Sequence, residues 1–317
     1  MTAKPSLTLH WNDCGRAEWH GYLTAADRSS LEQSWAYGAA MAAYHGQTVD
    51  RVIIRQGHIP VAMAQLYRKN LMGVLSVVRI VRGPLFLDGQ EDGEPRQDIL
   101  RAFRDAFSLR RGDIPFWLPE LSDTPRNQTL MRSLGTRRMV TGMSSAWLDL
   151  SRDEAELRKG MTGSWRNALR MAEKNKANLV ITDSGDDISR DLADYDSFHR
   201  QKRFMGPSGG FVAAIAAAGQ ETGDVLVLTA NAGADRVAGI VLIRHGASAT
   251  YFISWTTETG RGINAHNLLL WRGIQALKDS GIRWLDLGGL NTGSGAGIAR
   301  FKLGLGPDPF TMAGTFL

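Results

Sequence analysis

The order of the predicted secondary-structure elements occurs twice in this chain, and this repeat constrains the fold more than any single motif. Each half contains a β-hairpin, a third strand, an amphipathic helix and a closing strand. In the first half, the predicted elements are a leading helix over 31–45 and then 52–54, 61–67, 76–81, 96–111 and 116–118. In the second half, they are 225–230, 237–244, 250–255, 264–280 and 283–287. The halves are offset by about 170 residues, so the pattern predicts two α/β domains of similar build.

Length and composition agree with two globular domains. The chain has 317 residues, of which 43% are hydrophobic and 22% charged, and this balance is typical of a protein with a sizeable core. The longest apolar run, 211–218, is too short for a membrane helix, and the N-terminus lacks a signal-peptide core. We therefore expect a cytoplasmic protein with no membrane span. The single cysteine, Cys14, and scattered histidines predict no disulfide framework and no metal site.

A glycine-rich run over 283–306 is the main candidate for chemistry. Asp286 lies in an apolar strand that ends at Gly288 and Gly289, and Lys302 follows a glycine-rich loop. Such backbone can bring N–H groups close to a ligand, and a lysine can supply charge for a phosphate or a developing oxyanion. The spacing fits neither a P-loop nor a dinucleotide fingerprint. The alternative is a loop that only reverses the chain.

Residues 151–178, between the halves, are charged and predicted to be helical. Arg166, Arg170 and Lys174 recur every four residues, so they form one basic stripe. The stripe fits either contact with a phosphate-bearing substrate or RNA, or a solvated helix face. We expect no DNA partner, because 32 acidic residues balance the basic ones and no aromatic-basic recognition motif is present.

Several short motifs follow one another in order over nearly the whole chain. They are Gln33-Ser34-Trp35, Arg82-Gly83-Pro84, Leu148-Asp149-Leu150, Trp165-Arg166, Arg170-Met171-Ala172-Glu173-Lys174, Asn267-Leu268-Leu269-Leu270-Trp271, Trp284-Leu285-Asp286-Leu287-Gly288-Gly289 and Phe301-Lys302-Leu303-Gly304. In this order and spacing the chain resembles the FemAB-like branch of the GNAT acyltransferase superfamily, which includes peptidoglycan-bridge aminoacyltransferases. No long coiled-coil insertion of the kind found in some relatives is present.

The resemblance implies an α/β (α+β) fold of two tandem GNAT-like domains, each a mixed central sheet flanked by helices. The expected limits are 1–150 and 151–304, with a C-terminal tail over about 305–317 that can return to the first domain. A substrate channel at the domain junction and transfer of an acyl or aminoacyl group to an amine are further implications.

The resemblance also assigns expected roles to the glycine-rich run. Lys302 matches the lysine of the family's Phe-Lys-x-Gly segment, which lies at the reaction centre or on a substrate phosphate. We expect Lys302, with the N–H groups of Gly288 and Gly289, to stabilise the oxyanion. Asp286 is expected either to orient or deprotonate the amine or to cap the end of its strand. Because no G-x-S-x-G elbow is present, direct attack in a ternary complex is expected.

Five further residues are expected to contact substrate, each with a structural alternative. Lys202 and Arg203, near His199 and Arg200, map loosely to basic residues of the family and could equally serve solubility. Arg82 either orders a loop or belongs to a structural turn. Trp255 could line a channel, and Arg166 belongs to the basic stripe.

The donor is left open between aminoacyl-tRNA and acyl-CoA. Residues 257–262 retain the glycines of an acyl-CoA pyrophosphate loop, but Thr257 stands where a leading Gln or Arg is expected. Gly260, Arg261 and Gly262 are therefore candidate cofactor-binding residues. The incomplete loop and the basic stripe favour aminoacyl-tRNA, and we expect no tightly bound cofactor.

The acceptor and the class of function also have alternatives. No lysine follows Gln33-Ser34-Trp35, which argues against a nucleotide-linked cell-wall precursor as the acceptor. The alternatives to aminoacyl transfer are an acyl-CoA-dependent N-acetyltransferase and, in another class, a non-catalytic GNAT-fold binding module.

Overall fold

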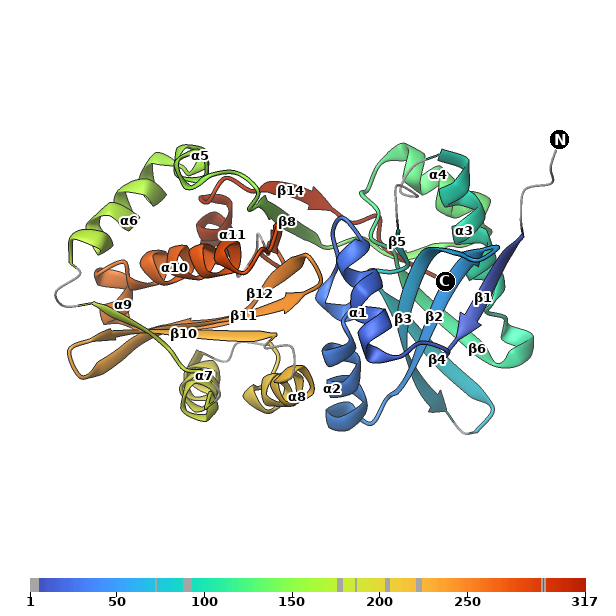
Figure 1. Cartoon of the computed structure of the whole chain (residues 1–317), viewed down its shortest axis with the longest axis horizontal. Helices are drawn as coiled ribbons and strands as arrows, with labels where there is room; N and C mark the ends of the chain where they lie inside the picture. Colours follow the sequence, from blue (N-terminus) through green and yellow to red (C-terminus); the bar gives the residue numbers. More distant parts are fainter. Residues whose placement is uncertain are drawn as a thin grey trace. The chain divides into compact units, whose positions relative to one another are not determined.

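The computed structural model describes residues 6–71, 73–87, 93–175, 179–185, 187–202, 206–220, 224–291, 293 and 295–317 (Figure 1). The chain divides into two compact units. The first comprises the residues up to Ser144 together with Phe310–Leu317, and the second comprises Ser145–Pro309.

The first unit contains helices on both faces of one sheet. Its elements are β1 (Leu7–Trp11), α1 (Arg16–Ala25), the 3₁₀ turn η1 (Leu31–Gln33), α2 (Trp35–His45), β2 (Thr48–Gln56), β3 (Ile59–Leu71), β4 (Leu75–Val81), β5 (Leu85–Phe86), α3 (Gly93–Asp105), η2 (Leu109–Arg111), β6 (Asp113–Leu118), α4 (Pro125–Ser133), β7 (Arg138–Val140) and β15 (Thr315–Phe316). The strand order is β1-β2-β3-β4-β6-β15-β7, and β5 pairs with β3.

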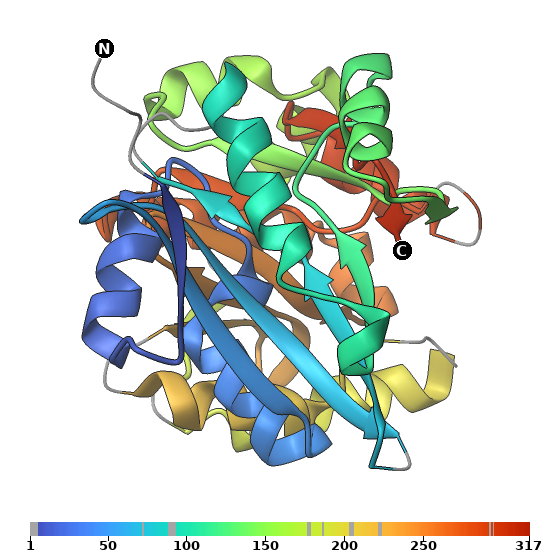
Figure 2. The ribbon, with the colours of Figure 1, turned by 90° about the vertical axis from the view of Figure 1, so that its right-hand side faces the viewer.

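Side-chain alternation on β2 and β3 explains the two layers of helices in the first unit. Val52 and Ile54 pack in a core with residues of α3 and α4, whereas Ile53 packs in a separate cluster with residues of α1. Successive residues of a strand point to opposite faces of the sheet. Figures 1 and 2 accordingly show α1 and α2 on the face of the sheet opposite α3 and α4.

The second unit has the same general plan. Its elements are β8 (Ser144–Asp149), α5 (Glu154–Gly160), α6 (Gly163–Lys174), β9 (Val180–Asp183), α7 (Ser189–Lys202), α8 (Gly209–Gly219), β10 (Val225–Ala232), β11 (Asp235–His245), β12 (Ser248–Thr256), α9 (Glu258–Gly262), α10 (Ala265–Asp279), β13 (Trp284–Asp286), α11 (Ala296–Leu303) and β14 (Asp308–Thr311). The strand order is β14-β8-β13-β12-β11-β10-β9.

Helix α10 is the central helix of the second unit. Figure 1 shows it between the sheet and α6, with α7 and α8 on the opposite face of the sheet. Leu269, Trp271 and Ile274 are almost completely buried in a core that also holds residues of β10, β11 and β12. Apolar residues recur around most of α10, as expected for a helix covered on two sides.

The predicted repeat of elements is confirmed, and the two units also share a parallel strand pair that was not predicted from the sequence. In the first unit, β2, β3 and β4 are followed by α3 and then by β6, which pairs with β4 in parallel. In the second unit, β10, β11 and β12 are followed by α10 and then by β13, which pairs with β12 in parallel. A parallel neighbour requires a crossover, and here a helix supplies it in both units.

Two predicted helices are divided in the structure, whereas the helix predicted over 264–280 is observed as Ala265–Asp279, with Asn264 at its N-cap position. The helix over 31–45 is divided at Ser34, which has extended backbone and whose side chain caps α2 by accepting from Tyr37 N. The helix over 96–111 is divided into α3 and η2. Asn264 precedes α10 but makes no side-chain cap, because its left-handed backbone joins α9 to α10.

The described residues contain neither a helix that could span a membrane nor a cluster of potential metal ligands. None of their helices combines the length and apolar character needed to cross a membrane. Within the same residues, no three His, Cys, Asp or Glu side chains lie together as metal ligands would.

Candidate active site

The candidate site lies where the parallel pairing of β12 and β13 stops. Ser248, Ala249 and Thr250 pair with Trp284, Leu285 and Asp286, respectively. β12 then continues to Thr256, whereas β13 ends at Asp286. The last residues of β12 therefore have no parallel partner, and the chain after β13 turns through Gly288 and Gly289.

Asp286 holds that turn in place. Its side chain is fully buried, and Oδ1 accepts hydrogen bonds from Ser145 Oγ at 2.7 Å and from Gly288 N at 2.8 Å. Gly288 has a φ of 70°, which favours glycine. These contacts favour the strand-capping role over amine deprotonation for Asp286. They also occupy the Gly288 N–H that was expected to stabilise an oxyanion.

Lys302 brings a buried ammonium to the same turn. The residue is on α11 and is only 8% exposed, and its Nζ donates to Gly289 O at 3.0 Å. Nζ also lies 5.6 Å from the centre of the Tyr251 ring, within cation–π range. Burial lowers the pKa of Lys302 to about 8, and the Asp286 carboxylate opposes that effect. The expected catalytic residues Lys302, Asp286, Gly288 and Gly289 are thus brought together.

Three hydrogen-bonded side chains lie near Lys302. The sequence did not predict that they come together. The Tyr251 hydroxyl lies 2.6 Å from Ser254 Oγ and 2.7 Å from His266 Nε2. Burial raises the pKa of the Tyr251 hydroxyl and lowers the pKa of His266 to about 4. His266 is therefore neutral near pH 7. The predicted strand over 250–255 and helix over 264–280 contained these residues, but only the fold brings the side chains together.

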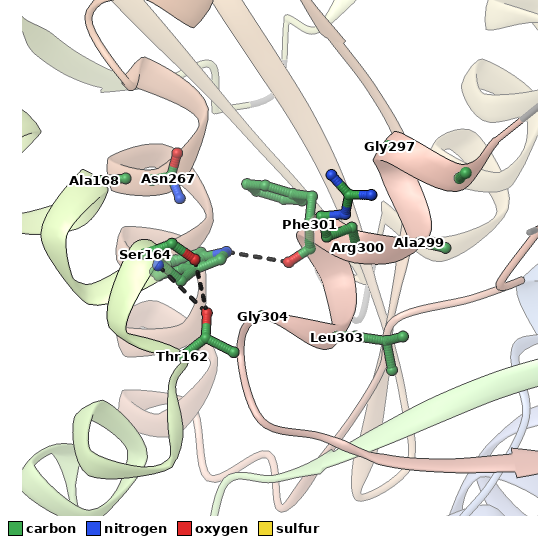
Figure 3. Close-up of a pocket in the computed structure, with 12 residues that line it drawn as sticks. Thr162, Ser164, Ala168, Asn267, Gly297, Ala299, Arg300, Phe301, Leu303 and Gly304 are labelled. Atoms are coloured by element: carbon green, nitrogen blue, oxygen red, sulfur yellow. Dashed lines mark hydrogen bonds between the residues drawn. The ribbon is translucent and has the colours of Figure 1, made fainter.

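A pocket of about 610 Å³ is formed by α6, α10, α11 and the residues after α11. Figure 3 shows Phe301 and Arg300 from α11 beside Asn267 of α10 and Ser164 of α6. Its lining comprises Thr162, Ser164, Trp165, Ala168, Asn267, Ala296, Gly297, Ala299, Arg300, Phe301, Leu303 and Gly304. Lys302 is not part of this lining, although it lies on the same helix.

Aromatic packing sets the wall of this pocket. Trp165 Nε1 donates to Phe301 O at 3.1 Å, and the centres of the two rings lie 5.8 Å apart. The Phe301 ring lies 5.1 Å from His266, which connects the pocket wall to the Tyr251 group. A side chain at Gly304 would place its Cβ 2.7 Å from Trp165 Cδ1, so glycine is needed for this packing. The exposed Arg300 side chain has no hydrogen-bond or ion-pair partner among the described residues.

The loop expected to bind acyl-CoA is instead the short helix α9. The N–H of Gly260 donates to the Thr257 side chain at 3.0 Å, and the N–H of Arg261 donates to the Thr257 carbonyl at 3.1 Å. The Arg261 guanidinium donates to the Thr256 carbonyl at 3.0 Å. Around Gly262 there is open space. Two of the amides expected to face a pyrophosphate are therefore already bonded.

Arg82 and Trp255 are both occupied in structural contacts. Arg82 Nη2 donates to Glu120 Oε1 at 2.7 Å, and Arg82 is 6% exposed. Its φ of 54° places it at a tight turn before Pro84. Trp255 is buried against Gly239 of the neighbouring strand. These contacts favour the structural alternative for Arg82 and place Trp255 in the sheet.

Of the other expected substrate-binding residues, Arg166 is engaged in backbone contacts, Lys202 is exposed and Arg203 lies outside the described residues. Arg166 donates to Lys159 O at 3.0 Å and Met161 O at 2.5 Å, so it caps the end of α5. Lys202 is the exposed last residue of α7. Arg203 lies outside the described residues.

Known proteins share both the domain in the second unit and the whole-chain fold. Residues 158–308 match the acetyltransferase (GNAT) domain family. The crystal structure of FemX is 13% identical with a TM-score of 0.81, over 97% of this chain and 96% of that chain. The C-terminal domain of a putative lysylphosphatidylglycerol synthetase from Agrobacterium fabrum is 13% identical with a TM-score of 0.56, over 95% and 91% of the two chains.

The name of a third solved structure indicates two GNAT domains in one chain. A tandem GNAT protein from the clavulanic acid biosynthesis pathway is 13% identical with a TM-score of 0.55, over 98% of both chains. No curated protein sequence matches this chain. At such identities the solved structures show the fold alone, and the domain match concerns residues 158–308 of the second unit. The second unit thus contains the match to the acetyltransferase (GNAT) domain, and the whole chain has the fold of FemX and of the tandem GNAT protein.

Proposed function

We propose that this protein transfers an aminoacyl group from aminoacyl-tRNA to an amine of a cell-wall-type or small-molecule acceptor. The observation that carries the proposal is the buried Lys302 ammonium, held by Gly289 at the end of the short β12–β13 pairing in a GNAT unit. The acceptor amine attacks the ester carbonyl directly, a C–N bond forms, and the ester C–O bond breaks as the tRNA ribose leaves.

Lys302 stabilises the negative charge that develops on the carbonyl oxygen during this attack. A cation that is shielded from water interacts more strongly with that charge than an exposed one does. The N–H of Gly289 has no hydrogen-bond partner among the described residues, so it is the backbone donor still available at the turn. Asp286 positions Gly288 and supports the charge of Lys302.

The pocket on the other side of α11 is the proposed donor site. An adenine can stack on the Phe301 ring, and a phosphate can pair with the unpartnered Arg300 guanidinium. The 3′ end of tRNA and coenzyme A both carry adenosine and phosphate. Because the α9 amides are bonded within the helix, we favour the tRNA end over coenzyme A. The name of the lysylphosphatidylglycerol synthetase relative also indicates transfer of an aminoacyl group.

The test uses tRNA charged with radiolabelled amino acids and three acceptor probes. The probes are a peptidoglycan precursor, a polyamine and vesicles that contain the aminophospholipid phosphatidylethanolamine. Wild-type protein should move label from tRNA to one probe. Lys302→Ala should abolish transfer, Phe301→Ala should weaken donor binding, and Lys159→Ala, an exposed lysine on α5, should behave as wild type. Failure of every charged tRNA to donate would contradict the proposal.

The alternative of an acyl-CoA-dependent N-acetyltransferase is supported by the match of residues 158–308 to the acetyltransferase domain family. It requires saturable binding of acetyl-CoA and release of a free thiol during turnover. A non-catalytic GNAT-fold module would instead bind a ligand without turnover of either donor.

We further propose that the two compact units are the functional domains expected from the sequence, with the C-terminal segment belonging to the first. Residues 310–317 contribute β15, which pairs with β6 and β7 in the sheet of the first unit. We propose that the protein acts in the cytoplasm, where charged tRNA is found.

A further inference from the structure

An exposed apolar surface lies at one end of the first unit. It is formed by the ends of β3 and β4 and by η2, and we name it the hairpin tip. Its apolar residues are Leu71, Val74, Leu75 and Leu109. Val74 and Leu109 are 75% and 73% exposed and are the two most exposed large hydrophobic side chains among the described residues. Figures 1 and 2 show these ends of β3 and β4 at the lower margin of the unit.

The backbone holds the two parts of the hairpin tip together. Ser76 N donates to Gly112 O at 2.7 Å, and Gly112 N donates to Leu109 O at 3.0 Å. A Cβ on Gly112 would lie 2.3 Å from Val74 O, so only glycine permits this approach. The apolar side chains are therefore presented by a strand hairpin and a turn that are fixed to each other before any partner binds.

Basic residues adjoin the apolar residues in the chain. Lys69, Arg110 and Arg111 are exposed, and neither Lys69 nor Arg110 has a side-chain partner among the described residues. The nearby acids are already paired, since Asp105 accepts from Arg104 at 2.9 Å and Asp113 accepts from Arg68. The unpaired cations can therefore bind anions.

Exposed aliphatic side chains ringed by lysine and arginine are typical of surfaces that bind anionic lipid. The apolar groups enter the interfacial region of the bilayer while the cations pair with headgroups. The same charges argue against a second copy as the partner, because two identical hairpin tips would repel each other.

We propose that the hairpin tip docks the first unit on an anionic lipid surface. The contact is peripheral, with Val74 and Leu109 inserted and Lys69 and Arg110 at headgroup level. It would bring an amine acceptor embedded in or tethered to a membrane within reach of the protein. The hairpin tip and the Lys302 turn share no residues, so the test of docking does not depend on transferase activity.

The test is flotation of the full-length protein with vesicles of phosphatidylcholine alone or of phosphatidylcholine mixed with phosphatidylglycerol. Wild-type protein should float with the mixed vesicles and not with the neutral ones. A variant with Val74→Asp and Leu109→Asp should lose more than about tenfold in partitioning. A variant with Lys69→Gln and Arg110→Gln should lose about fivefold per residue and show a weaker dependence on salt.

Ile59→Asp is the matched control, because Ile59 is 64% exposed at the opposite end of β3. It should partition within about twofold of wild type. Circular dichroism and thermal melting should show that all variants fold, since the changed side chains are exposed. The proposal is overturned if wild-type protein ignores mixed vesicles or if the Asp variants bind as wild type does. It is also overturned if the only effect of the Asp variants is to change the oligomeric state.

Discussion

Both units contain a helical crossover between two parallel strands, but the two strands stay paired over different lengths. In the first unit, β4 and β6 stay paired over six residues, from Ser76 with Asp113 to Val81 with Leu118. In the second unit, β12 and β13 pair over only three residues and then separate. The buried polar group of Asp286, Lys302 and Tyr251 lies directly beyond that short pairing.

We propose that the second copy of the fold carries the chemistry and that the corresponding turn of the first copy is structural. A long strand ladder satisfies its backbone groups internally and leaves no donor for a ligand. Directly after the β4–β6 pairing of the first unit, the Arg82 guanidinium forms an ion pair with the Glu120 carboxylate. After the short pairing in the second unit, Lys302 has only a backbone carbonyl as a hydrogen-bond partner among the described residues. We therefore expect catalytic effects from the second turn and stability effects from the first.

The largest expected effect is on transfer by Lys302→Ala. Removing the cation that faces the developing oxyanion should lower kcat by about 10²–10³-fold. Stability should change by less than about 1 kcal/mol, because loss of the Gly289 contact is offset by relief of the buried charge. Transfer assays and thermal melting of the same preparation measure both quantities. Equal loss of folding and activity would make Lys302 structural.

The counterpart in the first unit is Arg82→Ala. It leaves the partly buried Glu120 carboxylate unpaired, so the free energy of unfolding should fall by roughly 2–3 kcal/mol. Activity per folded molecule should stay near that of wild type. Urea unfolding with a transfer assay at low temperature would separate the two effects. A large loss of kcat at unchanged stability would contradict a purely structural role for Arg82 in the first unit.

A smaller difference in stability is expected between alanine variants at the two glycines of α9. Gly260→Ala should destabilise the protein by about 2 kcal/mol, because the new Cβ would lie 2.3 Å from Val237 O. Gly262→Ala meets open space and should be neutral or stabilising by up to roughly 1 kcal/mol. Calorimetric titration with acetyl-CoA should show no saturable binding to wild type. Binding that weakens in the Gly262 variant would restore the acyl-CoA alternative.

The repeat of elements in the sequence predicted the fold. The sequence also predicted the position of the tight turn after Asp286. Asp286 followed by a glycine pair predicted a tight turn after an apolar strand, and the structure has Gly288 there with positive φ. Local pattern was sufficient because a strand end and a glycine turn are determined by neighbouring residues.

The burial of Lys302 and its contact with Tyr251 could not be read from the sequence. Both depend on where α11 packs against β12, and these segments are far apart in the chain. Helix α9 was missed because five residues with two glycines have poor helix propensity, and a close contact with Val237 fixes its position. The pocket around Phe301 likewise requires α6, α10 and α11 together.

The most direct test of the central claim is the pH dependence of single-turnover transfer in wild type and in Lys302→Arg. The folded-state pKa of Lys302 is lowered to about 8, so its charged form is lost as pH rises through that value. Wild-type transfer should therefore fall by about tenfold between roughly pH 7 and pH 9. Arginine keeps its charge, so the variant, even if slower, should lack this descending limb. The same limb in both proteins, or a wild-type rate that rises through pH 8, would contradict a catalytic Lys302 cation.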